Sequence, residues 1–134
     1  MKKGQLINQP ISSLIASLGH TYEIVIVDAG LPIPAETKRI ALALTRGIPS
    51  FEETLMTVLE EMCVEKAYVS NEIKDYSPHV LELIQSAIGD MPVELIPHPQ
   101  FKERTKNAKA IIRTGEFTPY ANVILVSCPW GFDL

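Results

Sequence analysis

Segments with helical periodicity alternate with short runs of β-branched residues, and this alternation most restricts the folds available to the chain. The clearest run extends from Tyr22 to Asp28 and predicts a buried strand. Strands that alternate with helices build a mainly parallel sheet flanked by helices, so we expect an α/β fold. The length of 134 residues suits a single domain spanning residues 1–134. Further strands are expected at residues 39–45, 66–70, 93–96, 110–113 and 120–126.

Proline and capping residues mark the expected helix starts. Pro10 opens a helix with an apolar face, and Gly19 is expected to end that helix in the left-handed conformation. Ser50 and Glu53 have the spacing of a capping box, which predicts a second helix. Further helices are expected from residue 77 to residue 89 and from residues 97–99 to about residue 107.

The charge balance argues against two classes of partner. The net charge is −4, and no run of Lys or Arg exceeds the Lys2-Lys3 pair. Nucleic acid and membrane surfaces both require a basic face, so neither is expected as a partner. No apolar stretch follows Lys2-Lys3, and the apolar runs are far shorter than the ~20 residues of a membrane helix. These features favour a cytoplasmic protein.

Two cysteines, Cys63 and Cys128, lie far apart in the sequence. They have neither C-x-x-C spacing nor a histidine cluster, so no zinc site is expected. A disulfide is possible, but two reduced cysteines in a cytosolic chain is the simpler interpretation. The charged share of 21% lies below the typical ~25%, which suggests that part of the surface meets another subunit.

Asp28 ends the clearest strand, at the edge where parallel sheets carry their working groups. The alternative is that Asp28 only caps the turn formed by the glycine and two prolines that follow. His20 comes just after the expected end of the first helix, where the helix dipole favours an imidazolium that could donate a proton. The alternative for His20 is an exposed or helix-capping side chain.

Three residues late in the chain are further candidates. His98 stands between two prolines at the start of a helix, where it could cap the helix or bind a ligand. Tyr120 and Asn122 lead into the last strand and offer directional hydrogen bonds of the kind that a sugar hydroxyl site requires. An ordinary strand entry is the alternative for these two residues.

Several sequence blocks together resemble the ribose/fucose mutarotase family, in order and with matching spacing from Met1 to about Val126. The Gly-His, Asp-Ala-Gly-Leu-Pro and Pro-Tyr-Ala-Asn blocks are the most specific, and the last of them favours the ribose branch. The segment from Ser127 to Leu134 departs from the usual family ending. The matching blocks are residues 1–4, 11–13, 18–21, 27–34, 47–51, 110–116 and 118–125.

The resemblance implies a role for particular residues. His20 matches the proton donor of the family, and Asp28 matches a carboxylate that binds the sugar. His98 matches a histidine that binds the substrate, and Lys102, one helical turn later, is a weaker candidate for a sugar contact. The segment that holds the sugar is matched by Tyr120, Ala121 and Asn122.

The resemblance also implies an activity and an assembly. The expected reaction interconverts β-pyranose and β-furanose ribose by acid–base ring opening and reclosure, without metal or other cofactor. The expected partner is D-ribose, and the expected assembly is a homodecamer of two stacked pentamers with sites between subunits. In that assembly one chain would supply His20 and Asp28, and its neighbour would supply His98 and residues 120–122.

Three other functions are compatible with the same sequence. A fucose-type mutarotase would act on a six-carbon deoxy sugar. A sugar-binding accessory of a ribose transporter would bind ribose without catalysis, and a structural ring-forming protein would not bind it.

Overall fold

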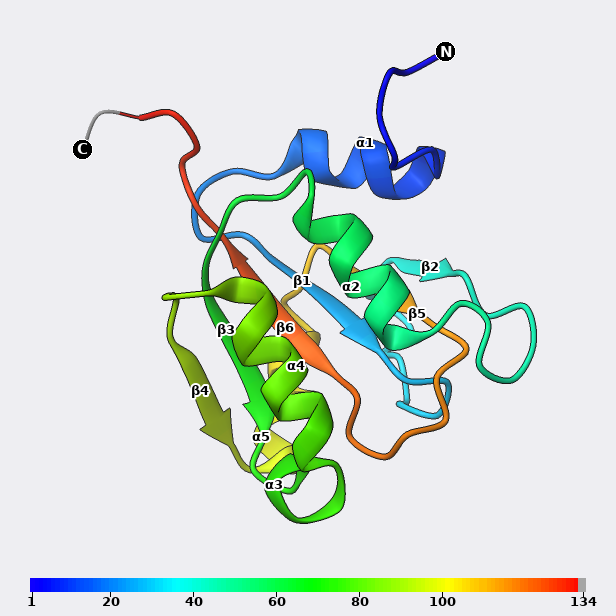
Figure 1. Cartoon of the computed structure of the whole chain (residues 1–134), viewed down its shortest axis with the longest axis vertical. Coiled ribbons are helices and arrows are strands. Elements are labelled where there is room, and N and C mark those ends of the chain that lie inside the picture. The colour runs from blue at the N-terminus through cyan, green and yellow to red at the C-terminus, as the bar shows by residue number, and fades with distance from the viewer. Residues whose placement is uncertain (133–134) are drawn as a thin grey trace.

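One six-stranded sheet, in the order β2-β5-β1-β6-β3-β4, forms the centre of the computed structural model, which describes residues 1–132 (Figure 1). Strand β6 runs antiparallel to both of its neighbours, and the other pairs are parallel. The expected α/β fold with a mainly parallel sheet is therefore confirmed. The strands are β1 (Glu23–Val27), β2 (Arg39–Ala41), β3 (Val64–Ser70), β4 (Val93–Ile96), β5 (Ala110–Arg113) and β6 (Val123–Ser127).

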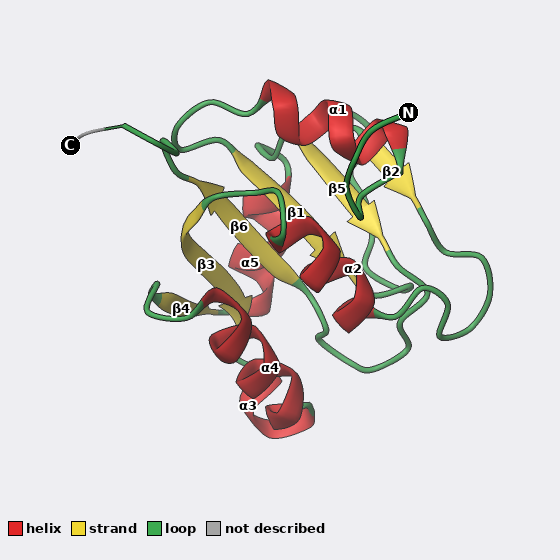
Figure 2. Ribbon diagram, turned by 45° about the horizontal axis from the view of Figure 1, so that its top comes forward, coloured by secondary structure: helices red, strands yellow, loops and turns green. Residues whose placement is uncertain are grey.

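Helices cover both faces of the sheet, as Figure 2 shows. On one face, the core includes buried side chains from α1, α2 and α4. On the other face, Phe101 of α5 packs on the sheet and is fully buried. The helices are α1 (Gln9–Ser17), α2 (Phe51–Leu59), α3 (Ile73–Tyr76), α4 (Pro78–Ile88) and α5 (His98–Thr105).

The alternation of side chains along β1 divides the core between the two faces. Ile24 and Ile26 belong to the cluster beneath α1, α2 and α4, whereas Val25 and Val27 belong to the cluster beneath α5. All four side chains are fully buried. Strand β1 is thus buried on both faces, which explains its unbroken apolar sequence.

Two helix ends test the predicted capping. The capping box of α2 is confirmed, because Ser50 Oγ accepts from Glu53 N and Glu53 Oε1 accepts from Ser50 N, each at 3.0 Å. The predicted stop at Gly19 is wrong. Leu18 ends α1 with an extended backbone and packs against the core, and the left-handed residue in this turn is Thr21, with φ 71°.

Two strands differ most from their predicted bounds. The strand expected at 39–45 keeps only Arg39–Ala41, and beyond it Leu44 is largely exposed in a loop. The last strand begins at Val123 because Tyr120 has φ 61°, a left-handed conformation that no strand residue adopts. The short helix α3 was not predicted.

Cys63 and Cys128 form a disulfide, with Cα atoms 5.3 Å apart, so the expectation of two reduced cysteines is wrong. Cys63 precedes β3 and Cys128 follows its antiparallel neighbour β6, which brings both to the same end of the sheet. Cys128 N also donates to Cys63 O at 3.0 Å. None of the helices within residues 1–132 combines the length and apolar character needed to cross a membrane.

Candidate functional site

A cavity of about 460 Å³ lies where β1 and β5 end and β6 begins. We call it the carboxyl-edge pocket, because the parallel strands end on this side of the sheet, which is the lower side in Figure 1. Open α/β sheets commonly bind ligands at this edge. Its polar lining residues are Asp28, His98, Arg113, Glu116, Tyr120 and Asn122.

Asp28 is held on both sides in this pocket. Its Oδ1 accepts from the backbone N–H groups of Gly30 at 3.0 Å and Leu31 at 2.8 Å, so the carboxylate does cap the following turn. Asp28 N donates to Asn122 Oδ1 at 2.8 Å, while Asp28 Oδ2 has only a 3.4 Å contact with Asn122 Nδ2. Burial raises the pKa of Asp28, although the hydrogen bonds from Gly30, Leu31 and Asn122 oppose the rise.

His98 begins α5 beside the same pocket. Its Nδ1 lies 2.7 Å from Ser70 Oγ, and its backbone N donates to Glu72 Oε1 at 3.2 Å. Burial lowers the pKa of His98, and the charge of Lys102 lowers it further, while the carboxylates of Glu72 and Asp28 oppose the shift. A lowered pKa favours neutral imidazole at pH 7, which can both accept and donate a hydrogen bond.

Tyr120 is fixed by its backbone and by two aromatic neighbours. Its ring is nearly perpendicular to the His98 ring, at 87° and a centroid distance of 5.1 Å, and its centroid lies 5.2 Å from that of the Tyr76 ring. The next residue, Ala121, is fully buried and does not line the pocket, so only its backbone is available to a ligand. Lys102 is exposed on α5 and is likewise absent from the lining.

Arg113 and Glu116 line the pocket but were not predicted as site residues. Arg113 Nε and Nη2 both donate to Ala29 O, at 3.0 and 2.9 Å, which fixes the loop after Asp28. Burial acts to raise the pKa of Glu116, but hydrogen bonds from Phe51 N and the Thr118 hydroxyl outweigh it and leave that pKa lowered. Arg113 ends the 110–113 strand and Glu116 follows it, and this position at the carboxyl edge was the signal that could have identified them.

His20 lies at the opposite edge of the sheet, before β1 begins. The five residues of β1 extend about 16 Å, at ~3.3 Å per residue, so they separate His20 from Asp28 by the height of the sheet. Asp28 therefore groups with His98, Tyr120 and Asn122, and the expected division, with His20 and Asp28 on one side, is wrong. The predicted strand from Tyr22 to Asp28 already separated these two residues, and grouping them by their early position in the chain overlooked it.

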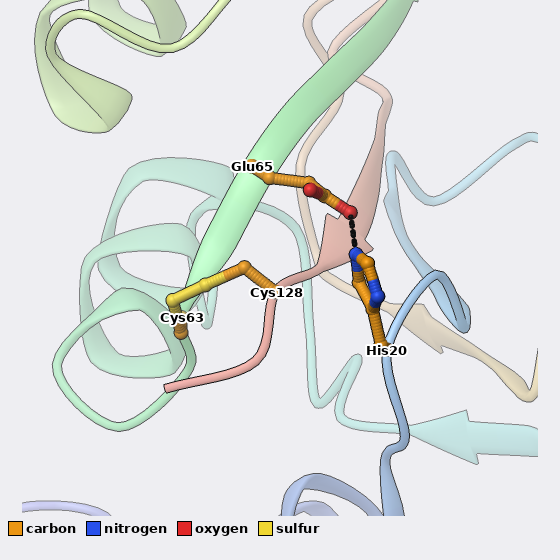
Figure 3. Close-up of a disulfide and its surroundings, with 4 residues drawn as sticks. All are labelled: His20, Cys63, Glu65 and Cys128. Atoms are coloured by element: carbon orange, nitrogen blue, oxygen red, sulfur yellow. Dashed lines mark hydrogen bonds and ion pairs between the residues drawn. A yellow bond between two sulfur atoms is a disulfide. The ribbon is translucent and has the colours of Figure 1, made fainter. Parts of the chain in front are cut away.

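Glu65, on β3, is the partner of His20 that the sequence did not reveal. His20 Nε2 lies 2.8 Å from Glu65 Oε1, and half of the His20 side chain is exposed (Figure 3). A cavity of about 490 Å³ beside them includes the Cys63–Cys128 disulfide and Trp130 in its lining. We call this region the amino-edge cleft. Within residues 1–132, no cluster of His, Cys, Asp and Glu is suited to hold a metal ion.

Comparison with known proteins identifies one family and relatives that are D-ribose pyranases. Residues 1–128 match the model of the RbsD / FucU transport protein family. The chain is 51% identical to D-ribose pyranase of Geobacillus kaustophilus over 127 residues, covering 95% of this chain and 93% of the relative. It is 46% identical to D-ribose pyranase of Enterococcus faecalis, covering 95% and 97% of the two chains.

Two solved structures share the fold. Bacillus subtilis RbsD complexed with D-ribose superimposes with a TM-score of 0.93 at 43% identity, covering 96% of this chain and 98% of the other. The fucose mutarotase of Streptococcus pneumoniae in complex with L-fucose gives a TM-score of 0.75 at 25% identity, covering 92% and 94%. Of these two structures, RbsD is the more similar in both fold and sequence.

Proposed function

The chain belongs to the RbsD / FucU transport protein family, and from this premise we propose that it interconverts the β-pyranose and β-furanose forms of D-ribose. It is thus an isomerase of sugar rings. The observation that carries the proposal is the polar pocket in which Asp28 and Asn122 are hydrogen-bonded to each other beside His98. Relatives at about half identity are D-ribose pyranases, and the similar RbsD structure contains D-ribose.

Ring opening needs two proton transfers, ring closure needs two more in the reverse sense, and no step is redox. A proton is delivered to the ring oxygen as its bond to the anomeric carbon breaks, and the anomeric hydroxyl loses a proton to give the open aldehyde. A different hydroxyl of the open sugar then attacks the aldehyde carbon; this hydroxyl gives up its proton while the aldehyde oxygen takes one, and the smaller ring closes. Positioned acid–base groups typically accelerate such steps by about 10²–10⁴-fold. The proposed mechanism uses no metal or other cofactor.

The carboxyl-edge pocket would hold and orient the sugar. Asp28 Oδ2 is available to accept from a sugar hydroxyl, because the turn uses only Oδ1. Asn122, the Tyr120 hydroxyl and the backbone at Ala121 supply further directional contacts. Lys102 stays a candidate for a peripheral contact only, since it lies outside the pocket lining.

The base at the anomeric hydroxyl is either His98 or a water molecule bound beside it. Neutral His98 is suited to the task because burial lowers its pKa. When His98 Nδ1 donates to Ser70 Oγ, the unprotonated Nε2 can accept the proton.

His20 is the proposed acid at the ring oxygen, and a second copy of the chain would bring it to the pocket. The support is its separation from Asp28 by the length of β1, which leaves His20 unable to reach the pocket of its own chain. We propose a homodecamer of two stacked pentamers with sites between subunits. Exposed apolar side chains such as Leu44 and Phe117 are compatible with such contacts.

Saturation-transfer NMR of ribose tests this function. Transfer between pyranose and furanose signals should accelerate with added protein, and His20→Ala should lower this acceleration by about 10²–10⁴-fold. Faster exchange of fucose anomers than of ribose forms would favour the fucose-type activity. Binding of ribose without exchange would indicate a sugar-binding accessory, and absence of binding would indicate a structural protein.

The cytoplasmic location stays a prediction, and the disulfide bears on it. Disulfides persist mainly in oxidising compartments and are rare in the cytosol. Thiol alkylation in intact cells tests both points: labelling of Cys63 and Cys128 before lysis would indicate reduced cysteines and a cytoplasmic location, whereas protection of both would indicate that the disulfide forms in an oxidising compartment.

A further inference from the structure

Glu65 is placed to control His20. Within residues 1–132, the His20 side chain forms its hydrogen bond with Glu65, and the two residues are 45 positions apart in the sequence. Figure 3 shows the carboxylate pointing directly at one ring nitrogen, while the other ring nitrogen points away. We propose that Glu65 is a positioning residue that orients the His20 ring for proton transfer, an inference that rests on the proposed ring-opening function.

The chemistry of the pair assigns a role to each ring nitrogen. A carboxylate only accepts, so the 2.8 Å contact requires His20 Nε2 to carry a proton and donate it to Glu65 Oε1. The nitrogen that remains for the sugar is Nδ1. His20 Nδ1–H gives its proton to the ring oxygen as the bond from that oxygen to the anomeric carbon breaks. Glu65 stabilises the imidazolium before the transfer and keeps its charge throughout.

The backbone around the pair is fixed on both sides. Thr21, beside His20, has φ 71°, and its N–H donates to Ser127 O at 3.0 Å. On the other side, Glu65 lies in β3, two residues after Cys63, whose disulfide to Cys128 joins the ends of β3 and β6. Both side chains thus project from anchored segments, so the remaining freedom is the rotation of the two side chains themselves. The hydrogen bond between them removes that freedom.

The His20–Glu65 pair is partly exposed, so its contribution to the stability of the fold should be small. The side chains of His20 and Glu65 are 50% and 37% exposed, and ion pairs with such exposure contribute little to folding. Loss of Glu65 should therefore leave the fold intact and act on the reaction. Since Glu65 lies at the opposite edge from the pocket of its own chain, its loss should change kcat and leave the KM for ribose unchanged.

A double-mutant cycle with NMR exchange kinetics tests the proposal. We expect Glu65→Ala to lower kcat by about 10–100-fold, the size of loss known for partners that orient metal-bound histidines, with KM unchanged. Glu65→Gln keeps an accepting oxygen and should lose less. In the His20→Ala background, Glu65→Ala should have no further effect, because a residue that acts through His20 has nothing left to position. Glu82→Ala, which alters an exposed residue of α4, is the matched control and should behave as wild type.

The outcomes separate this proposal from the function on which it rests. Absence of exchange by the wild-type protein would overturn the proposed function. If His20→Ala abolishes exchange while Glu65→Ala retains the wild-type kcat, the function stands and the positioning role is wrong. An additive loss in the double variant, or a change confined to KM, would also contradict the positioning role.

Discussion

The two edges of the sheet hold their polar side chains in different ways. At the carboxyl edge, Asp28 and Asn122 are bound to each other and to backbone groups, and Asn122 is buried. At the amino edge, His20 and Glu65 form a single contact and are partly exposed to solvent. The first arrangement is suited to hold a sugar in one orientation. The second is suited to act on a molecule that another copy of the chain presents.

The two edges of the sheet share one feature: each has a non-glycine residue in the left-handed conformation. Thr21 and Tyr120 are the non-glycine residues with positive φ within residues 1–132. Such conformations cost about 1–3 kcal/mol each and persist where the surrounding structure enforces them. Thr21 follows His20, and Tyr120 precedes the buried Ala121-Asn122 pair. The strain therefore lies beside both groups of proposed functional residues.

The largest expected effect comes from removing the acid at the amino edge. His20→Ala should lower the rate of ribose ring exchange by about 10²–10⁴-fold, the usual contribution of a positioned acid or base. Ribose affinity should be unchanged, because the pocket that holds the sugar is intact. Saturation transfer gives the rate, and a ribose titration gives the affinity. Wild-type exchange in this variant would mean that the amino edge does not take part in catalysis.

At the carboxyl edge, Asn122→Ala should reduce both affinity and stability. The substitution leaves the Asp28 N–H without its acceptor, which costs about 1–3 kcal/mol in the free energy of unfolding. The KM for ribose should rise, because Asp28 and residue 122 would no longer present their oxygens together. Denaturant unfolding and exchange kinetics measure the two effects. Asn107→Ala, at an exposed position, is the control, and equal behaviour of the two variants would contradict the account.

The disulfide should matter for stability and not for exchange. It closes a loop across a separation of 65 residues, and replacing both Cys63 and Cys128 by Ser should lower the free energy of unfolding by about 2–4 kcal/mol. The β3–β6 pairing and the Cys128–Cys63 backbone hydrogen bond remain, so Glu65 should keep its place. Thermal unfolding with and without reductant measures the stability. A large loss of exchange in the folded variant would show that the disulfide also fixes the amino edge.

The smallest expected effect is the contribution of His98 to the pH dependence of the free energy of unfolding. Burial lowers its pKa in the folded protein, whereas the unfolded chain takes up the proton near the ordinary value of about 6.5. The unfolded state therefore binds more protons just below pH 6.5, and stability falls as the pH drops through that window. Unfolding of wild type and His98→Asn at pH 7.5 and 5.5 measures the slope. The variant should lose less stability on acidification, and equal slopes would contradict the burial of His98.

Local sequence patterns predicted the elements that local physics determines. The run from Tyr22 to Asp28 became β1 with its acid at the carboxyl edge, and Ser50 capped α2 as expected. In both cases the signal lies within a few residues, in burial periodicity or in a side chain that accepts from a nearby N–H.

Features that depend on strand order were not predicted. The partner of His20 and the Cys63–Cys128 bond both follow from the position of β6 beside β3, as does the reversed direction of β6. The sequence around Glu65 contains no signal that predicts its contact with His20, because the pair forms only when the sheet is assembled. The grouping of Asp28 with Asn122 has the same origin, since β1 and β6 are neighbours in the sheet.

Complementation between two inactive variants tests most directly whether the two edges meet between copies of the chain. His20→Ala lacks the proposed acid, and Asp28→Asn lacks a carboxylate that holds the sugar. Each alone should be inactive. Co-expressed, they should regain exchange at about a quarter of the sites, because each site draws one residue from each of two randomly mixed copies. If the mixed assembly is as inactive as its components, the two edges do not form a shared site, and the account is wrong.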